Sequence, residues 1–411
     1  MSVVADRFEI LSLAGQGGMG KVFRARDAQS GTVVALKQLT VLDADAAQRF
    51  DRESEALARL EHPGVVRHVA HGLNDGVPYL AMQWVDGEEL RLRLKREGVL
   101  EPAQVVMLAK RLAAALAHAH GRGIVHRDIK PSNVVLPTPD LADAVIIDFG
   151  LARTEDDELT RTGMLVGTPI YMAPEQVRDN AVTPSVDVFA LGCVMYQCLA
   201  QTTPFAANGA TAVLTRVLFD EPVPLERIVP GVPHALAELV ASMLRKAPSE
   251  RPTMRDVEGA LAELDDGRAT IPAAPKLSTA EQRVVSVIAL GAPAQSDEGA
   301  TLRQSASASV DAEVLGAIAA RHGARASTLP NGAAVVVVEA EGAASDLAAR
   351  AAECALSLKR AMPDVPVSLA TGRAQQMGEG LPLGEAIDRA VALAPFEGNA
   401  VRVDEVTAGL L

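Results

Sequence analysis

The sequence predicts an α+β protein in which a strand-rich segment precedes a helical one, with a smaller α/β domain after them. Three observations predict this class. Apolar and polar residues alternate in short runs between residues 8 and 39, as half-buried strands require. A long alanine-rich helical pattern begins at residue 102. A second series of strand and helix patterns begins at residue 283, after a stretch rich in proline and alanine.

Length and composition predict more than one hydrophobic core. The chain has 411 residues, of which 48% are hydrophobic, and single cores rarely grow past about 250–300 residues. The stretch at 265–280 has the composition of a linker because it combines charged residues, glycine, proline and alanine. We therefore predict a first domain at 1–264 and a second, smaller α/β domain at 281–411.

Charge and hydropathy restrict the location and the partners. A net charge of −13 argues against binding to nucleic acid or to an anionic membrane. No apolar run reaches the roughly 18 residues of a membrane span, and the N-terminus lacks the basic and apolar regions of a signal peptide. The three cysteines have no metal-ligand spacing, and so few favour a reducing compartment. We expect a cytoplasmic protein with no membrane span and no nucleic-acid partner.

The first distinctive feature is a glycine-rich stretch that contains Gly15, Gly17 and Gly20. A dinucleotide-binding fold would place a helix after these glycines, but Val22–Arg26 alternates like a strand. A Walker A loop would end in Ser or Thr, where this chain has Val22. A hairpin whose backbone N–H groups approach nucleotide phosphates fits the pattern best. A hairpin without a ligand remains the alternative.

The most informative stretch is 126–133, which reads His-Arg-Asp-Ile-Lys-Pro-Ser-Asn. An Asp-Phe-Gly sequence at 148–150 closes an apolar run that follows it. The two stretches place a proton acceptor, Asp128, and two metal-binding side chains, Asn133 and Asp148, on neighbouring loops. Such a set of groups can transfer a phosphoryl group from Mg-ATP to a hydroxyl.

These stretches resemble the catalytic and metal-binding loops of bacterial eukaryotic-type (Hanks-type) Ser/Thr protein kinases. The resemblance extends over roughly residues 8–264. It implies the bilobal protein-kinase fold, with a β-rich N-lobe and a helical C-lobe. It also implies an enzyme that uses ATP and Mg2+ or Mn2+ and acts on protein substrates.

The resemblance implies a role for each catalytic residue. Asp128 would accept the proton of the substrate hydroxyl, and Lys130 would contact the γ-phosphate. Lys37, at the end of a strand, would hold the α- and β-phosphates. Asn133 and Asp148 would be the metal ligands. Each of these residues, taken alone, could instead belong to a capped turn or a surface ion pair.

A helix predicted over 46–60 would supply the partner of Lys37. Glu53 is preferred to the nearby Glu55 because it lies one turn before Leu57, which then faces the core. Tyr79–Gly87 is similar to the last N-lobe strand and the hinge of kinases. The residues expected around ATP are Gly15, Gly17, Gly20, Val22, Ala35, Lys37, Met82, Gln83, Trp84 and Val85.

The segment between residues 150 and 173 resembles a kinase activation segment. Thr160 and Thr162 stand where bacterial relatives carry phosphothreonines, although both could be ordinary loop hydroxyls. Arg127, beside the catalytic aspartate, suggests activation by autophosphorylation because a cation there favours a phosphate partner. The resemblance also implies supporting roles for four residues. These structural residues are Thr168 near Asp128, Asp187 beneath the catalytic loop, and the pair Glu175 and Arg251.

The second domain is similar to class III nucleotide cyclases in its order of strands and helices. The order includes a hairpin predicted at Asn331-Gly332 and a helix over 344–361. The two metal-binding aspartates of that family align with Gly291 and Asn331, and its transition-state arginine aligns with Ala392. We therefore expect a degenerate, regulatory domain without cyclase activity. An unrelated α/β domain remains the alternative.

The sequence suggests three alternative functions for the whole chain. The leading one is an active Ser/Thr kinase that transfers the γ-phosphate of ATP to protein hydroxyls. A nucleotide-binding pseudokinase scaffold would require a missing catalytic residue, and none is missing. A nucleotide cyclase is disfavoured by Gly291 and Asn331. We also hypothesise a homodimer formed through 281–411 or through the kinase N-lobe.

Overall fold

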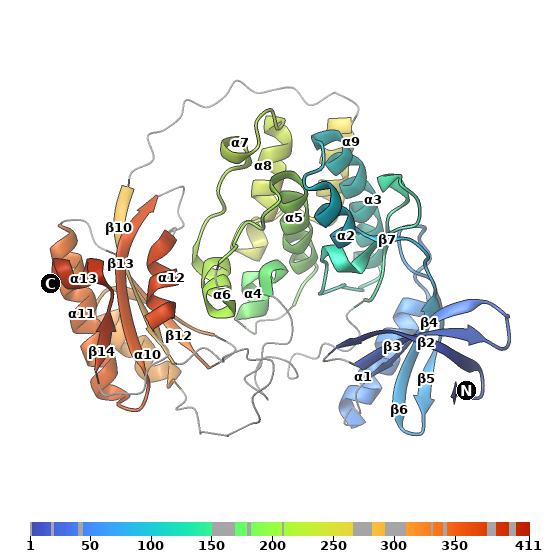
Figure 1. Cartoon of the computed structure of the whole chain (residues 1–411), viewed down its shortest axis with the longest axis horizontal. Helices are drawn as coiled ribbons and strands as arrows, with labels where there is room; N and C mark the ends of the chain where they lie inside the picture. The colour runs from blue at the N-terminus through green and yellow to red at the C-terminus, as the bar shows by residue number, and fades with distance from the viewer. Residues whose placement is uncertain are drawn as a thin grey trace. The chain divides into compact units, whose positions relative to one another are not determined.

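The computed structural model describes most of the chain. The described residues are 2–17, 20–39, 44–149, 169–178, 182–207, 209–265, 282–291, 310–329, 332–339, 343–375, 384–393 and 400–411. They form two compact units (Figure 1). The first unit contains residues 1–155, 182–203 and 224–272, and the second contains residues 156–181, 204–223 and 273–411.

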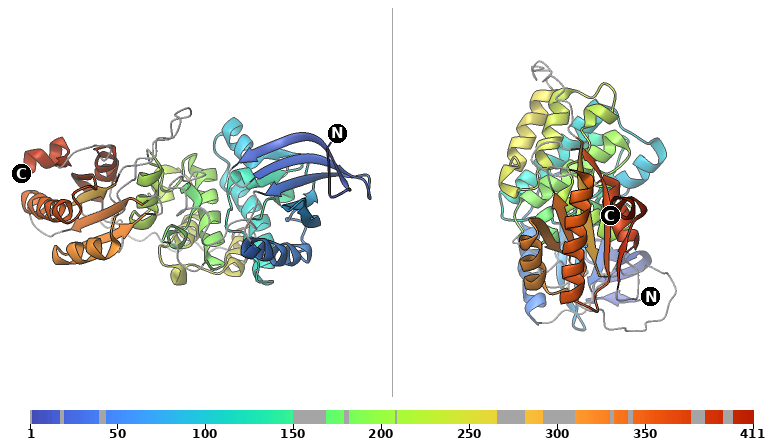
Figure 2. Two further views of the ribbon diagram at one scale, coloured as in Figure 1. Left: turned by 90° about the horizontal axis from the view of Figure 1, so that it is seen from below. Right: turned by 90° about the vertical axis from the view of Figure 1, so that its left-hand side faces the viewer.

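A six-stranded sheet, blue in Figure 2, opens the first unit. Its strand order is β1-β2-β3-β4-β6-β5. The predicted strands between residues 8 and 39 are confirmed. Helix α1 (Ala44–Ala58) packs against β5 and is the helix predicted over 46–60. The strands are β1 (Val3–Val4), β2 (Phe8–Gly17), β3 (Gly20–Asp27), β4 (Val33–Leu39), β5 (His68–Asn74) and β6 (Val77–Gln83).

The two faces of this sheet differ because side chains alternate along each strand. One face forms a core around Phe8, whose ring meets Tyr79 edge-on at 5.8 Å between centroids. Val34 and Leu36 of β4 belong to that core. Lys37, the next residue after Leu36, therefore points from the opposite face. That face carries the residues predicted to bind the nucleotide.

The rest of the first unit is mainly helical. Helix α3 begins with a reciprocal cap, in which Glu101 N donates to Gln104 Oε1 over 3.0 Å. It ends at His120 as predicted, but the left-handed glycine after it is Gly123 at φ 75°, whereas Gly121 keeps helical angles. The helices are α2 (Leu90–Glu97), α3 (Pro102–His120), α5 (Ser185–Ala200), α7 (Leu225–Ile228), α8 (His234–Met243) and α9 (Met254–Asp265).

Short strands and 3-10 turns position the loops of the first unit. A three-stranded sheet has the order β7-β8-β9. Two of its strands, β8 and β9, lie within the stretch between residues 126 and 148, which carries the predicted catalytic residues. The elements are β7 (Glu88–Glu89), η1 (Pro131–Asn133), β8 (Val134–Leu136), η2 (Leu141–Asp143), β9 (Val145–Ile146) and η4 (Pro248–Glu250).

The second unit contains a five-stranded sheet in the order β11-β12-β10-β13-β14, antiparallel except for the pair β13–β14. The predicted helix over 344–361 is confirmed as α11. The final strand and helix, β14 and α13, were not predicted. The strands are β10 (Gln282–Leu290), β11 (Ala324–Thr328), β12 (Ala334–Glu339), β13 (Val367–Gln375) and β14 (Val401–Val403).

Seven helical elements complete the description of the second unit. Three of them, η3 (Pro169–Tyr171), α4 (Pro174–Val177) and α6 (Ala210–Phe219), come from the middle of the sequence. The others are α10 (Ala312–Arg321), α11 (Ala344–Ala361), α12 (Gly384–Leu393) and α13 (Glu405–Leu410).

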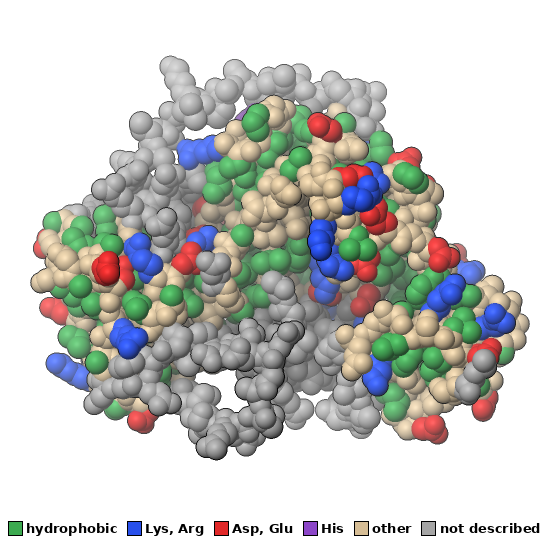
Figure 3. All heavy atoms as spheres, in the orientation of Figure 1, with side chains coloured by type: hydrophobic (Ala, Val, Ile, Leu, Met, Phe, Trp, Pro, Cys, Tyr) green, Lys and Arg blue, Asp and Glu red, His purple; other side chains and the backbone are tan. Residues whose placement is uncertain are grey.

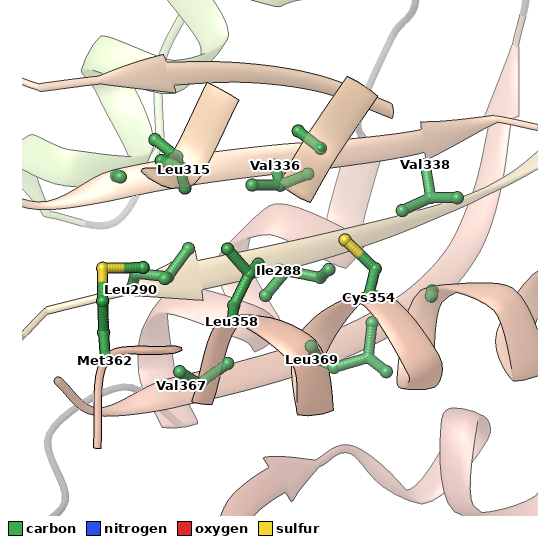
Figure 4. Close-up of a cluster of buried hydrophobic side chains, with 14 of the residues drawn as sticks. Ile288, Leu290, Leu315, Val336, Val338, Cys354, Leu358, Met362, Val367 and Leu369 are labelled. Carbon is green, nitrogen blue, oxygen red and sulfur yellow. The ribbon is translucent and has the colours of Figure 1, made fainter. Parts of the chain in front are cut away.

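Helices α10 and α11 cover one face of this sheet (Figure 4). Ile288 of β10, Val336 of β12 and Leu369 of β13 meet Leu358 and Cys354 of α11, all fully buried. The four consecutive valines of β12 predicted a strand buried on both faces, and each of them has an exposed fraction of 0%.

The hairpin predicted at Asn331-Gly332 is wrong in its length. Thr328 pairs with Ala334, so the connection runs over 329–333 and is longer than a two-residue turn. Leu329 N donates to Ala333 O over 2.7 Å, and Gly332 has φ 77°. The left-handed glycine was anticipated, but the sequence did not specify how many flanking residues leave the ladder. Asn331 itself lies outside the described residues.

The described surface carries charges of both signs. Figure 3 shows basic and acidic side chains interspersed with apolar ones over the face in view. No helix among the described segments is long and apolar enough to cross a membrane.

A pair of leucines on α11 provides a test of the second core. Leu358 is fully buried and Leu356 is 47% exposed. We expect Leu358→Ala to cost about 2–5 kcal/mol because it leaves a cavity, and Leu356→Ala to cost less than about 0.5 kcal/mol. Cys354 is buried in the same core, so its alkylation rate, followed by mass spectrometry, reports opening of this domain. Equal rates in both variants would contradict the packing.

Candidate active site

A buried carboxylate holds the loop that contains Asp128. Asp187, on the first turn of α5, is fully buried. Its Oδ2 accepts hydrogen bonds from His126 N and from His120 Nε2, both at 2.8 Å, and its Oδ1 accepts one from Arg127 N at 2.8 Å. Hydrogen bonds to a buried charge are among the strongest in proteins. Asp187 therefore anchors the backbone immediately before Asp128.

Two non-glycine residues of the site adopt left-handed backbone angles. Arg127 has φ 66° and Asp148 has φ 58°. Such angles cost on the order of 1–3 kcal/mol each and persist only where the surroundings enforce them. The hydrogen bond from Arg127 N to Asp187 enforces the first. The strain thus lies at the two loops that bear the carboxylates.

His126 fills the space between these loops. Its ring is fully buried and packs on Phe149 at 4.5 Å between centroids. Burial lowers the pKa of His126, against the opposing effect of Asp187 and Asp128. The hydrogen bonds agree with a neutral ring, because Nδ1 accepts from Asp128 N at 3.2 Å and Nε2 donates to Ile147 O at 3.1 Å. One side chain therefore links the backbones on both sides of the site.

Three predicted catalytic side chains lie together. Lys130 Nζ donates to Asp128 Oδ2 over 2.7 Å. Asn133 Nδ2 donates to Asp128 O over 2.8 Å and to Asp128 Oδ2 over 3.0 Å. Asp128 is thereby held in one orientation by a cation and an amide. Asn133 is buried, and it starts the chain into β8.

The predicted pair between Lys37 and Glu53 is not the one in this structure. Lys37 Nζ lies 2.5 Å from Asp148 Oδ1, and Glu53 Oε1 lies 3.6 Å from Arg127 Nη1. The Lys37 side chain is 9% exposed and the Asp148 side chain 34%. Lys37 and Glu53 thus each form an ion pair, but with a different partner from the one expected. The family resemblance implied the pair between Lys37 and Glu53, whereas the structure pairs Lys37 with Asp148.

The strand register brings the predicted nucleotide-binding residues together. Val22 pairs with Lys37, and Ala35 pairs with both Arg24 and Met82. Met82 is buried, whereas Gln83 is exposed. Trp84 and Val85 follow β6 and are half-buried. Trp84 donates through Nε1 to Asp86 Oδ1 over 2.8 Å, and the Arg24 guanidinium lies 5.5 Å from its ring centroid.

The glycines of the hairpin are required for different reasons. Gly20 has φ 135°, and a Cβ there would collide with the carbonyl oxygen of Gln38. Gly20 is therefore needed by the pairing of β3 with β4 itself. Gly15 has open space around its Cα, so local packing does not demand a glycine at that position. Gly17 pairs with Gly20 at the end of the hairpin.

The oxygen atoms of the site suit a hard cation. Asn133 uses Nδ2 for both of its hydrogen bonds to Asp128, which directs its Oδ1 to the other side. Asp148 is the one-third exposed partner of Lys37. Carboxylate and amide oxygens are the ligands that Mg2+ prefers, together with phosphates and water. Asn133 and Asp148 therefore fit the metal-binding role expected of them.

Of the remaining predicted residues, two are buried and three are not described. Glu175 is 4% exposed and Arg251 is 7% exposed. Arg251 donates to the carbonyl groups of Arg245 and Ser185 over 2.7 and 3.0 Å. The pair expected between Glu175 and Arg251 remains a prediction. Thr160, Thr162 and Thr168 lie outside the described residues.

Two contributions to the site were not identified from the sequence. His120, in the last turn of α3, contacts Asp187. His126 was part of the motif but had no role of its own. The sequence signal for both histidines was their position, since His120 is the last residue of α3 and His126 is the first residue of the stretch 126–133. The partner of His120 comes from α5, far along the chain, and the His126 ring contacts Ile147 and Phe149 on the next loop.

Replacement of Asp187 tests the anchor. Asp187→Asn would turn an amide N–H toward at least one backbone donor, and we expect it to lower the free energy of unfolding by about 2–4 kcal/mol. The fluorescence of Trp84, the single tryptophan, follows unfolding of the first unit in urea. Asp75→Asn is the matched control, because Asp75 is exposed. Equal midpoints for the two variants would contradict the proposed anchor.

Comparisons with known proteins agree with this geometry. The chain is 36% identical over 297 residues to the serine/threonine-protein kinase pkn3 of Myxococcus xanthus, covering 69% of this chain and 54% of that protein. It is 36% identical over 286 residues to the serine/threonine-protein kinase PknD of Mycobacterium tuberculosis, covering 68% and 41%. The chain thus spans about half, or less, of the length of these relatives.

A solved structure shows the same fold. The crystal structure of Rad53 1-466 in complex with AMP-PNP matches with a TM-score of 0.53 and 26% identity, covering 62% of this chain and 64% of that one. Residues 8–260 match the family described as protein kinase domain. The predicted bilobal kinase fold is confirmed for this part, and the chain belongs to the protein kinase domain family.

Proposed function

We propose that the chain is a Ser/Thr protein kinase that transfers the γ-phosphate of ATP to protein hydroxyls. The observation that carries the proposal is the cluster of Asp128, Lys130 and Asn133, with Lys37 and Asp148 paired beside it. No position of the catalytic set is replaced by an inert residue. The similarity to bacterial Ser/Thr kinases supports the same activity.

Each residue has a task in this reaction. Asp128 takes the proton of the attacking hydroxyl, while Lys130 and Asn133 keep its carboxylate in position. Lys37 and Lys130 provide positive charge for the phosphates. Asn133 and Asp148 would hold Mg2+, which when bound neutralises charge on the phosphates. Most of the rate enhancement then comes from positioning and electrostatics.

The pairing of charges supports an activation step. Glu53 contacts Arg127 and Lys37 contacts Asp148. We propose that autophosphorylation at Thr160 or Thr162 supplies a phosphate for Arg127, since a phosphate attracts a guanidinium more strongly than a carboxylate does. Glu53 would then be released to pair with Lys37, as the family resemblance implies. Asp148 would become available to the metal.

The second domain favours a role other than cyclase chemistry. Gly291 has φ 88°, and its Cα faces the backbone of Ala333, 3.2 Å from where a Cβ would be. An aspartate there would be strained, so this position suits glycine rather than a metal ligand. Asp388, where the family pattern has asparagine, is in an ion pair. These features support a degenerate, regulatory α/β domain.

Two isosteric substitutions test the kinase activity. Asp128→Asn removes the proton acceptor, and Asp148→Asn weakens the metal site. We expect each to lower the transfer of labelled phosphate to a generic basic protein by about 100-fold or more. Asp75→Asn, on an exposed turn, is the control and should retain the full rate. Wild-type rates in both site variants would exclude this function.

Mass spectrometry across 150–175 tests the activation step. After incubation with Mg-ATP, we expect phosphate on Thr160 or Thr162 in the wild-type chain and none in Asp128→Asn. The double variant Thr160→Ala, Thr162→Ala should then show a lower rate on the protein substrate. Phosphorylation to the same extent in Asp128→Asn would point to a contaminating kinase. Absence of phosphate from the wild-type segment would refute the step.

A further inference from the structure

Helix α6 is unusual because it is buried nearly all the way round. A helix that packs on one side only shows an apolar stripe and a polar face. In α6 the single charged residue is Arg216. Eight of its ten residues are buried: Thr211, Ala212, Val213, Leu214, Thr215, Val217, Leu218 and Phe219. Such a helix requires partners on more than one side.

The C-terminal α/β domain provides one of these partners. Helix α12 packs against α6 within the second unit. Arg216 Nη2 donates to Asp388 Oδ2 over 2.6 Å. The two side chains are 22% and 28% exposed, so the pair is partly buried but still open to screening by salt. The pair joins a helix inside the kinase match at 8–260 to a domain outside that match.

Besides Asp388, two groups close to α6 in the sequence contact the guanidinium of Arg216 and orient it. Its Nη1 donates to Ala206 O over 2.7 Å, and its Nε lies 3.8 Å from Asp220 Oδ2. Both partners belong to the segment that carries α6. A planar guanidinium held in this way presents its remaining donors in a fixed direction, which favours one carboxylate position over others. Asp388 occupies that position.

A second contact comes from a different element of the α/β domain. The Arg325 guanidinium of β11 lies 6.0 Å from the ring centroid of Phe219, at the end of α6. Its Nη2 also donates to Glu339 Oε1 on the neighbouring strand, so this arginine is fixed by its own sheet. In the first contact the arginine belongs to α6, and in the second it belongs to the α/β domain.

We propose that α6 is the docking helix for the C-terminal α/β domain of the same chain, and that Arg216 and Asp388 determine the specificity of the contact. The burial of α6, the contact with α12 and the two arginine contacts lead to this partner. A protein substrate or a second copy of the chain would have to displace it. In this arrangement the C-terminal α/β domain is held against α6, a helix that lies within the kinase match at 8–260.

Hydrogen–deuterium exchange on the full-length chain tests the proposal. Asp388→Arg places two cations together, and we expect exchange of the α6 amides to rise about tenfold, a coupling of about 1.4 kcal/mol. Arg216→Asp should have a similar effect. The double variant Arg216→Asp, Asp388→Arg restores an ion pair and should return α6 to wild-type protection. Glu353→Arg, on the exposed side of α11, is the control and should leave α6 unchanged.

An unchanged α6 in Asp388→Arg would overturn the proposal, and so would a double variant that exchanges as fast as the single ones. Asp388→Asn guards against misfolding because it keeps the shape of the side chain. In the wild type, added salt should speed exchange of α6, and this salt dependence should disappear in Asp388→Asn. If it persists there, the ion pair does not hold the contact. Protection of α6 that rises with protein concentration would indicate a second copy and refute docking within one chain.

Discussion

The site depends on one buried carboxylate. Asp187 accepts hydrogen bonds from two successive backbone N–H groups and from His120. The bond from Arg127 N to Asp187 helps to hold the strained backbone of Arg127. The carboxylate comes from α5, the most deeply buried helix of the first unit. A rigid apolar helix therefore positions a polar loop, which is a common division of labour between scaffold and site.

Charge pairing gives the same site two arrangements. In the structure Lys37 is matched with Asp148, and Glu53 with Arg127. In the arrangement proposed for the active kinase, Lys37 pairs with Glu53, and Arg127 pairs with a phosphate. A phosphate near Arg127 would be sufficient to favour the second one. Regulation by phosphorylation then needs no new catalytic group.

The C-terminal domain differs from the kinase site in how its polar groups are used. The kinase site keeps its charged side chains near Asp128. In the α/β domain the buried hydroxyls of Ser286, Thr371 and Thr407 are bonded to one another, at 2.8 and 3.0 Å. Each of these hydroxyls therefore has a hydrogen-bond partner inside the core. The polar side chain of that domain that contacts α6 is Asp388, which pairs with Arg216.

The sequence by itself predicted the kinase fold, the strands between residues 8 and 39 and a set of candidate catalytic residues. These follow from local patterns, since alternation, helix periodicity and the spacing at 126–133 need no distant partner. The tertiary structure alone decided which charges pair, because Lys37, Glu53 and Arg127 lie on separate elements. It also decided the hairpin length at 329–333 and the contact between Arg216 and Asp388. Long-range distances set these features, and a linear sequence does not contain such distances.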